Sequence, residues 1–301
     1  MTVTLMDRYP ELRKEIAGSG VTVAQIDAME QTVFATYDEL AEPLPDTMLW
    51  KTQKPAHARR CRAQAREFAS VLGLTNLEVA LFALLFASHD LGRLVEAGRT
   101  HRKEPRAKWL HGKDSVDIMR PILGQLAETT LGHWIMDALD HHSDAQDVTL
   151  ETVGGSRGSF AMCVTLRDLD KLEGFRSAKD YTSNPERKAK ERLQNWPEQV
   201  KQDPAWGTEL GQIDPDRMLD LFAQSQPVPR AECRSYEAYM LQYLRWVFNI
   251  VHTEMLTITL REGGPQIVAN YLLAQLKRGA PEQYARLLQC LLDWQDGVLL
   301  A

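Results

Sequence analysis

The stretch TNLEVALFALLFASHDLGR, residues 75–93, decides the fold. Residues 77–91 are apolar on nearly every side of a helix, which predicts a helix at the centre of a bundle. Gly92 lies just beyond the expected end of this helix. The doublet His89-Asp90 therefore falls at the end of a buried helix, where an unpaired carboxylate would be costly. We expect other polar side chains of the core to meet it.

Helical periodicity continues on both sides of this stretch, and no convincing series of alternating strands is present. The expected helices cover residues 54–72, 77–91, 112–126, 130–142, 158–172, 266–277 and 281–299, with Gly73 as a helix stop and Thr75 or Asn76 as a cap. The polar stretch 96–108 is too charged for a core element, and 176–232 is a loop-rich segment with short helices. The sequence predicts an all-α fold. We expect one helical domain over residues 1–301, with a core at about 50–175, N-terminal helices in 1–49 and a C-terminal helical extension in 176–301.

The composition is that of an ordinary globular protein. The chain has 301 residues, 44% of them hydrophobic, and a formal net charge of -6, which argues against general nucleic-acid binding and against binding to a membrane surface. The most apolar segment, 79–87, is too short to span a bilayer, which needs about 20 residues. Four scattered cysteines predict a reducing compartment, and residues 1–20 lack the apolar run of a signal peptide. We expect a cytoplasmic protein, with a homo-oligomer left open.

Seven of the eight histidines fall within residues 57–142. His101 in its polar stretch and His133 on the outer face of its helix are expected at the surface, whereas His252, beyond this range, is expected in the core. His89 is followed by Asp90 at the end of a buried helix, His141 and His142 are adjacent at the end of another helix, and Asp168 and Asp170 follow a third apolar run. Imidazoles and carboxylates gathered in a core make a nitrogen and oxygen site for hard or borderline divalent metals.

Five motifs carry this chemistry in a fixed order: His57, the doublet His89-Asp90, His111, the pair His141-His142, and Asp170. The doublet is embedded in Ser-His-Asp-Leu-Gly-Arg over residues 88–93, and residues 167–173 read Arg-Asp-Leu-Asp-Lys-Leu-Glu. Together these motifs resemble the HD superfamily of metal-dependent phosphohydrolases, with its HD-aliphatic-Gly-basic signature and its Asp-x-Asp-Lys-Leu segment. The resemblance covers roughly residues 50–175 and, as a set of five ordered motifs, is specific.

The resemblance implies an HD-domain helical bundle that holds two divalent metal ions. The implied ligands of the first ion are His57, His89, Asp90 and Asp170; Asp90 bridges to a second ion held by His111 and His141, with His142 as an open candidate. Asp168 stays open as the alternative to Asp170. Such a site admits iron, manganese, nickel, cobalt, zinc or magnesium.

The same resemblance implies hydrolysis of a phosphate monoester or diester by a hydroxide that bridges the two cations. The ligand spacing is similar to that of the HD-GYP phosphodiesterases. However, no Gly-Tyr-Pro follows His142, so we do not predict cleavage of cyclic-di-GMP.

Basic residues bracket the expected site, at 59–66 on one side and 99–113 on the other. In an acidic chain this placement favours a small anionic, phosphorylated substrate, a nucleotide or another metabolite. Arg93 and Lys113, which lie beside expected ligands, join Asp90 as the catalytic candidates, with a contact to phosphate as their expected role.

Two alternatives stay open. A small branch of the HD superfamily uses the same ligands to hold two irons and to cleave carbon bonds with dioxygen, and the basic clusters favour hydrolysis over this reaction. A non-catalytic HD signalling module is the second alternative, and the completeness of the ligand set argues against it.

Overall fold

The computed structural model of the chain describes residues 4–46, 48, 50–102, 104, 111–142, 148–184, 215–223, 236–279 and 281–299. The described residues form helices and no strand, which confirms the predicted all-α class. Their contacts group the chain into two compact units, Met1–Glu173 with Ile250–Met255, and Gly174–Asn249 with Leu256–Ala301.

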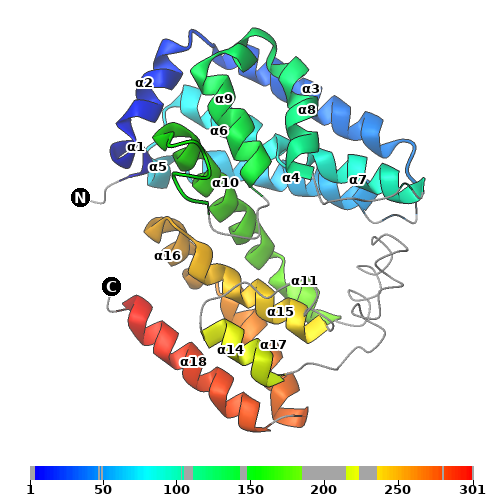
Figure 1. The fold of residues 1–301 in the computed structure, drawn as a ribbon, viewed down its shortest axis with the longest axis vertical. Coiled ribbons are helices and arrows are strands. Elements are labelled where there is room, and N and C mark those ends of the chain that lie inside the picture. The colour runs from blue at the N-terminus through cyan, green and yellow to red at the C-terminus, as the bar shows by residue number, and fades with distance from the viewer. Residues whose placement is uncertain are drawn as a thin grey trace. The chain divides into compact units, whose positions relative to one another are not determined.

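The first unit is built from the N-terminal helices and the segment that carries the five motifs (Figure 1). It contains α1 (Leu5–Arg8), α2 (Pro10–Gly18), α3 (Val23–Ala41), α4 (Trp50–Glu67), α5 (Ala69–Leu72), α6 (Asn76–Ser88), α7 (Leu91–His101), α8 (His111–Leu123), the 3-10 helix η1 (Gly124–Glu128), α9 (Thr130–His141) and α10 (Arg157–Arg176) up to Glu173.

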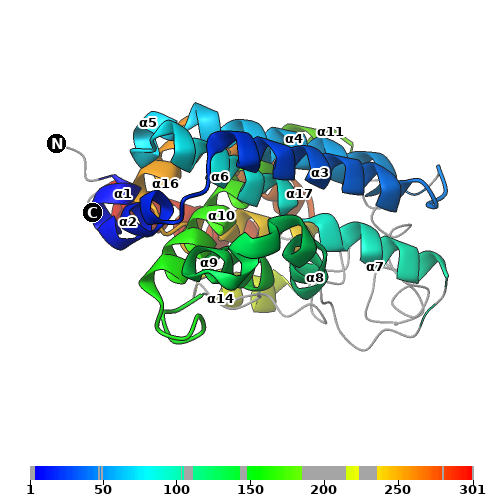
Figure 2. The same cartoon turned by 90° about the horizontal axis from the view of Figure 1, so that it is seen from above.

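Helix α6 is the predicted central helix. Thr75 caps it: its hydroxyl accepts a hydrogen bond from the Glu78 N–H, and the Glu78 carboxylate accepts one from the Thr75 N–H. Helices α3 and α4 pack along α6 (Figure 1 and Figure 2), and the Tyr37 hydroxyl of α3 donates to the Ala87 carbonyl at 3.0 Å. Gly73, with φ of 72°, ends α5 as the sequence predicts.

Helix α7 differs from the sequence-based expectation, which places a polar stretch from residue 96 onward. The structure keeps residues 91–101 helical because their charges are paired. Arg93 donates to Glu96 one turn later at 3.1 Å, and Arg99 makes a bidentate pair with Asp114 of α8, both bonds 2.7 Å long. The high density of charged residues from residue 96 onward therefore did not indicate a loop at residues 96–101.

The second unit has its own core. It contains the end of α10, α11 (Ala178–Ser183), α14 (Pro215–Ala223), α15 (Tyr236–Arg245), the 3-10 helix η3 (Trp246–Asn249), most of α16 (Thr253–Arg261), α17 (Gly264–Gly279) and α18 (Pro281–Leu299). Phe175 stacks edge-on against Tyr243 and Trp246, so the aromatic residues of α15 and η3 pack in a core. Gly264 approaches Phe175 so closely that an added Cβ would lie 2.7 Å from its backbone oxygen.

None of the helices in the described part of the chain combines the length and the apolar character that crossing a membrane requires.

Candidate metal centre

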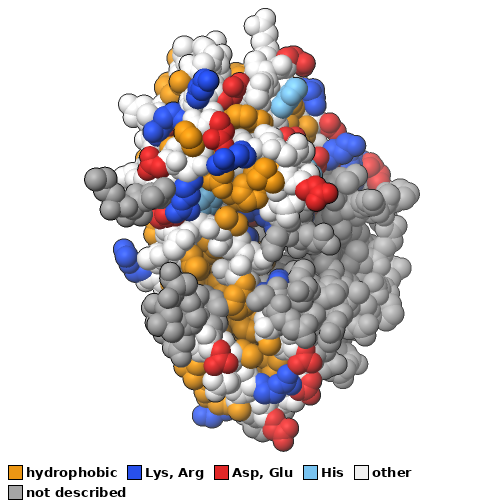
Figure 3. All heavy atoms as spheres, turned by 60° about the vertical axis from the view of Figure 1, so that its left-hand side comes forward, with side chains coloured by type: hydrophobic (Ala, Val, Ile, Leu, Met, Phe, Trp, Pro, Cys, Tyr) orange, Lys and Arg blue, Asp and Glu red, His pale blue; other side chains and the backbone are white. Residues whose placement is uncertain are grey.

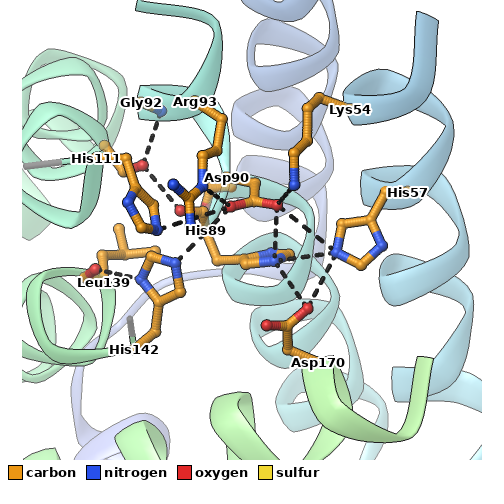
Figure 4. A network of polar contacts seen from close by, with 12 residues as sticks. Lys54, His57, His89, Asp90, Gly92, Arg93, His111, Leu139, His142 and Asp170 are labelled. Atoms are coloured by element: carbon orange, nitrogen blue, oxygen red, sulfur yellow. Dashed lines mark hydrogen bonds and ion pairs between the residues drawn. The ribbon is translucent and has the colours of Figure 1, made fainter. Parts of the chain in front are cut away.

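The five motifs converge inside the first unit (Figure 4). The doublet His89-Asp90 forms the turn between α6 and α7, and four other elements meet it there. His57 comes from α4, His111 begins α8, His142 follows the end of α9, and Asp170 comes from α10. Residues from five places along the chain therefore surround one carboxylate, that of Asp90.

The first group of donor atoms lies on one side of Asp90. The His57 Nε2 atom is 3.3 Å from His89 Nε2 and 3.1 Å from Asp170 Oδ1. The Asp90 Oδ2 atom lies 3.7 Å from His57 Nε2 and 3.5 Å from His89 Nε2. Two ligands bound at about 2.0–2.2 Å to the same cation are themselves separated by about 3–3.5 Å, so these side chains fit around a single ion.

The second group lies on the other side of Asp90. The Oδ1 atom is 4.0 Å from His111 Nε2 and 3.9 Å from His142 Nε2. The rings of His111 and His142 meet edge-on, with centroids 4.9 Å apart. These three donors are buried and all lie within 4.8 Å of one another, so they form a second set that could hold a metal ion.

Hydrogen bonds to backbone carbonyls fix two of the imidazoles. The Nδ1 atom of His89 is 2.7 Å from the Phe86 carbonyl oxygen, and that of His142 is 2.6 Å from the Leu139 carbonyl oxygen. Because a carbonyl oxygen can only accept, Nδ1 is the donor in both rings, which leaves Nε2 as the atom that can bind a metal. Figure 4 shows both Nε2 atoms turned towards Asp90.

The charge states of Asp90, His111 and His142 suit metal binding. Burial opposes ionisation of Asp90, but Lys54, His89, His142 and Arg93 outweigh burial and hold the pKa of this carboxyl well below its ordinary value. Burial lowers the pKa of His142, and burial together with Arg93 keeps the pKa of His111 well below its ordinary value. The carboxylate is therefore ionised near neutral pH and both imidazoles are neutral, the forms that bind metals.

Unused hydrogen-bonding capacity supports the same conclusion. Three buried ring nitrogens, both of His111 and the Nε2 of His142, have no hydrogen-bond partner in the part of the chain that the structure describes. Buried polar atoms of this kind are rare in native proteins. A cation bound beside Asp90 would satisfy the Nε2 atoms of His111 and His142, so the donor set fits a divalent metal.

Two glycines allow the helices to approach closely enough to form the cluster. A Cβ on Gly92 would lie 2.0 Å from the His111 carbonyl oxygen, and one on Gly112 would lie 2.3 Å from the Asp140 carbonyl oxygen. The obstacles are backbone atoms, which cannot rotate away. The start of α8 is therefore pressed against α7 and against the end of α9, and this contact places His111 beside His142.

A buried hydroxyl joins the same elements. The Ser115 Oγ of α8 accepts a hydrogen bond from the Gly92 N–H at 2.9 Å and donates one to the His89 carbonyl at 2.8 Å. We expect Ser115→Ala to lower the free energy of unfolding by about 1–3 kcal/mol, because it leaves buried backbone groups unsatisfied. Chemical denaturation measures this loss. Ser88→Ala is the matched control, since that buried hydroxyl bonds only the Leu85 carbonyl of its own helix and its loss should cost less.

No family model, curated protein or solved structure matches this chain. The helical fold and the cluster of His57, His89, Asp90, His111, His142 and Asp170 are compatible with an HD domain.

The structure distinguishes Asp170 from Asp168. The Asp170 carboxylate faces His57 and His89, whereas the Asp168 carboxylate is fully buried and is occupied elsewhere. Asp168 accepts hydrogen bonds from the Val251 and His252 backbone N–H groups and lies 2.8 Å from His252 Nδ1. Of the two open candidates, Asp170 is the one in the donor group, and His252 is buried as predicted.

Two predicted site residues lie outside the cluster. The donor groups found among the described residues include His142 and leave out His141, which is half-buried at the end of α9. Successive residues of a helix point about 100° apart, so one face of the helix end can present only one of the pair to Asp90. Lys113 is exposed on α8. His101 and His133 are exposed, as expected.

Most of the bracketing basic residues that the structure describes have structural partners. On α4, Arg60 pairs with Glu173, Arg62 pairs with Glu30, and Arg59 lies over the Phe34 ring. On the face drawn in Figure 3, Lys and Arg side chains are interspersed with Asp and Glu. The predicted basic residues Lys103, Arg106 and Lys108 lie outside the described residues. Among the predicted basic residues that the structure describes, Arg93 is the one that reaches the cluster, with its Nε atom 3.5 Å from Asp90 Oδ1.

Sequence reasoning missed two residues of α4. Lys54 places its Nζ atom 2.5 Å from Asp90 Oδ2, and Cys61 places its Sγ atom 3.5 Å from His57 Nε2. Both lie about one helical turn from His57, at i−3 and i+4, and therefore on its face of the helix. That spacing is the signal that could have found them.

Proposed function

We propose that the chain is a metal-dependent phosphohydrolase that acts on a nucleotide or another small phosphorylated metabolite, with two divalent cations bridged by Asp90. The observation that carries the proposal is the position of this carboxylate. Its Oδ2 atom faces His57 and His89, which also face Asp170, and its Oδ1 atom faces His111 and His142.

The donor residues form two sets, one for each cation. His57 and His89 with Asp170 would hold one cation, and His111 with His142 would hold the other. Bound divalent cations supply Lewis-acid neutralisation of phosphate oxygens and lower the pKa of water. An imidazole ligand carries no negative charge, so it cancels none of the positive charge that an anionic substrate meets.

Two basic side chains beside Asp90 are suited to bind the phosphate. Lys54 and Arg93 flank opposite oxygens of the carboxylate, and their side chains are 21% and 19% exposed. Both can therefore meet an anion that reaches the cluster from solvent. Arg93 is held in place by Glu96 and by the Trp50 ring, which lies 5.8 Å from its guanidinium carbon, so its planar fork is already oriented.

We expect Arg93→Gln to lower kcat/KM for a phosphate ester by roughly 10²–10³-fold, because it removes a preorganised positive charge from the site. The matched control is Arg120→Gln, which changes an exposed arginine of α8 and should leave kcat/KM unchanged. Steady-state kinetics on both variants measure the effect. Equal kcat/KM values in the wild type and Arg93→Gln would remove Arg93 from substrate binding.

The proposed activity is tested by reloading the metal-stripped chain with manganese, cobalt, nickel, zinc, magnesium or ferrous iron and following hydrolysis of aryl phosphate monoesters and diesters. Hydrolysis that depends on added metal is the expected result. Two bound irons that consume dioxygen without hydrolysing any ester would contradict the proposal and favour the oxygenase alternative. Absence of hydrolysis with every metal would contradict it as well.

A further inference from the structure

Cys61 is a buried thiol in an unusual setting. It lies on α4 one turn after His57 and is 2% exposed. Its Sγ atom is 3.5 Å from Nε2 and 3.8 Å from Nδ1 of the His57 ring. The sulfur and one donor atom each of His57, His89 and Asp170 all lie within 4.8 Å of one another.

A buried cysteine usually behaves as a small apolar side chain. Cys163 on α10 illustrates the contrast: it is also buried, but the donor groups among the described residues do not include it. Cys61 instead shares its surroundings with two imidazoles and a carboxylate, all of which are metal-binding groups. The sulfur is thus a donor of a different element beside the nitrogen and oxygen donors of the first group.

We propose that Cys61 is a ligand of the cation in this first group. Sulfur bound at about 2.3 Å and nitrogen at about 2.0–2.1 Å to the same cation are separated by about 3.1–3.6 Å, and the observed Sγ to Nε2 distance of 3.5 Å lies in that range. When the metal binds, a sulfur–metal bond replaces the S–H bond and the proton passes to solvent.

A sulfur ligand restricts which metals are expected at this site. A thiolate favours zinc, cobalt, iron or copper over magnesium and calcium, which prefer oxygen ligands. The inference rests on the metal site of the proposed function but not on its phosphate chemistry. It adds a sulfur donor to the six histidine and aspartate residues already described.

Cobalt(II) provides the test, because a cobalt–thiolate bond gives a charge-transfer absorption band in the near-ultraviolet. The metal-stripped full chain is titrated with cobalt(II), as wild type, Cys61→Ser, Cys61→Ala and Cys290→Ser, the last a control at a half-buried cysteine outside both donor groups. We expect the band in the wild type and in Cys290→Ser and its loss in both Cys61 variants. The Cys61 variants should also bind cobalt at least about 10-fold more weakly.

The outcomes separate this inference from the proposed function. Visible cobalt bands without the charge-transfer band in the wild type would overturn Cys61 as a ligand and leave the metal site intact. No cobalt binding by the wild type would overturn the metal site itself. If the Cys61 variants fail to fold, X-ray absorption at the zinc edge of the zinc-loaded wild type decides alone: a sulfur neighbour of zinc is expected, and only nitrogen and oxygen neighbours would overturn the inference.

Discussion

Asp90→Ala is expected to reduce the metal content from two cations per chain to at most one and to lower the rate of phosphate-ester hydrolysis by at least about 10³-fold. The second donor group would keep only the neutral rings of His111 and His142, which offer no negative charge to a cation. The first group would keep Asp170 but lose one of its two carboxylates. Elemental mass spectrometry and a hydrolysis assay on the same samples measure both effects.

The effect of Asp90→Ala should be large because this carboxylate has several partners. The Asp90 carboxylate also lies between the positive charges of Lys54 and Arg93. In the variant these two side chains would face the cluster without a counter-charge. Asp117→Ala is the matched control, because Asp117 is exposed on α8, and it should keep both metals and full activity. Two cations per chain in Asp90→Ala would show that this residue does not bridge them.

Gly92→Ala is expected to lower the free energy of unfolding by about 2–3 kcal/mol, as overpacking of a tight contact does. The added Cβ would lie 2.0 Å from the His111 carbonyl oxygen and 2.8 Å from the Asp114 Cβ, so α8 has to move away from α7. His111 moves with α8, and the second cation should be lost. A fall of roughly 5–10 °C in the unfolding temperature and a lower metal content are the measurements.

Gly98→Ala, on the same helix, is the control that distinguishes the steric clash expected at Gly92 from a general effect of replacing glycine by alanine. A Cβ at Gly98 would meet only the Arg102 guanidinium, at 3.2 Å, and that flexible side chain can move. Alanine is also a better helix former than glycine by about 0.5–1 kcal/mol, so this variant should be as stable as the wild type or more so. Similar stability losses in both variants would contradict the role given to Gly92.

The fold could be predicted largely from local pattern. The apolar run that became α6 and the glycine stop at Gly73 depend on neighbouring residues, which the sequence displays directly. Helix α7 was harder, because one of its charged residues, Arg99, pairs with Asp114 of α8, which is distant in the sequence. Periodicity does not reveal such long-range pairs.

The candidate site was predicted in outline and not in detail. The ordered motifs indicated His57, His89 and Asp90, which the structure brings together. The choice between His141 and His142 depends on the rotation of a helix end, which sequence spacing does not determine. Lys54, Cys61 and the ion pairs that occupy Arg60 and Arg62 depend likewise on which helix face meets which neighbour.

Anomalous X-ray diffraction from crystals of the metal-loaded chain, recorded at the absorption edge of the metal, tests whether Asp90 bridges two cations. We expect two anomalous peaks, one on each side of the Asp90 carboxylate. One should lie beside His57, His89 and Asp170, and the other beside His111 and His142. A single peak, or peaks only at other places on the protein, would show that Asp90 does not bridge two cations.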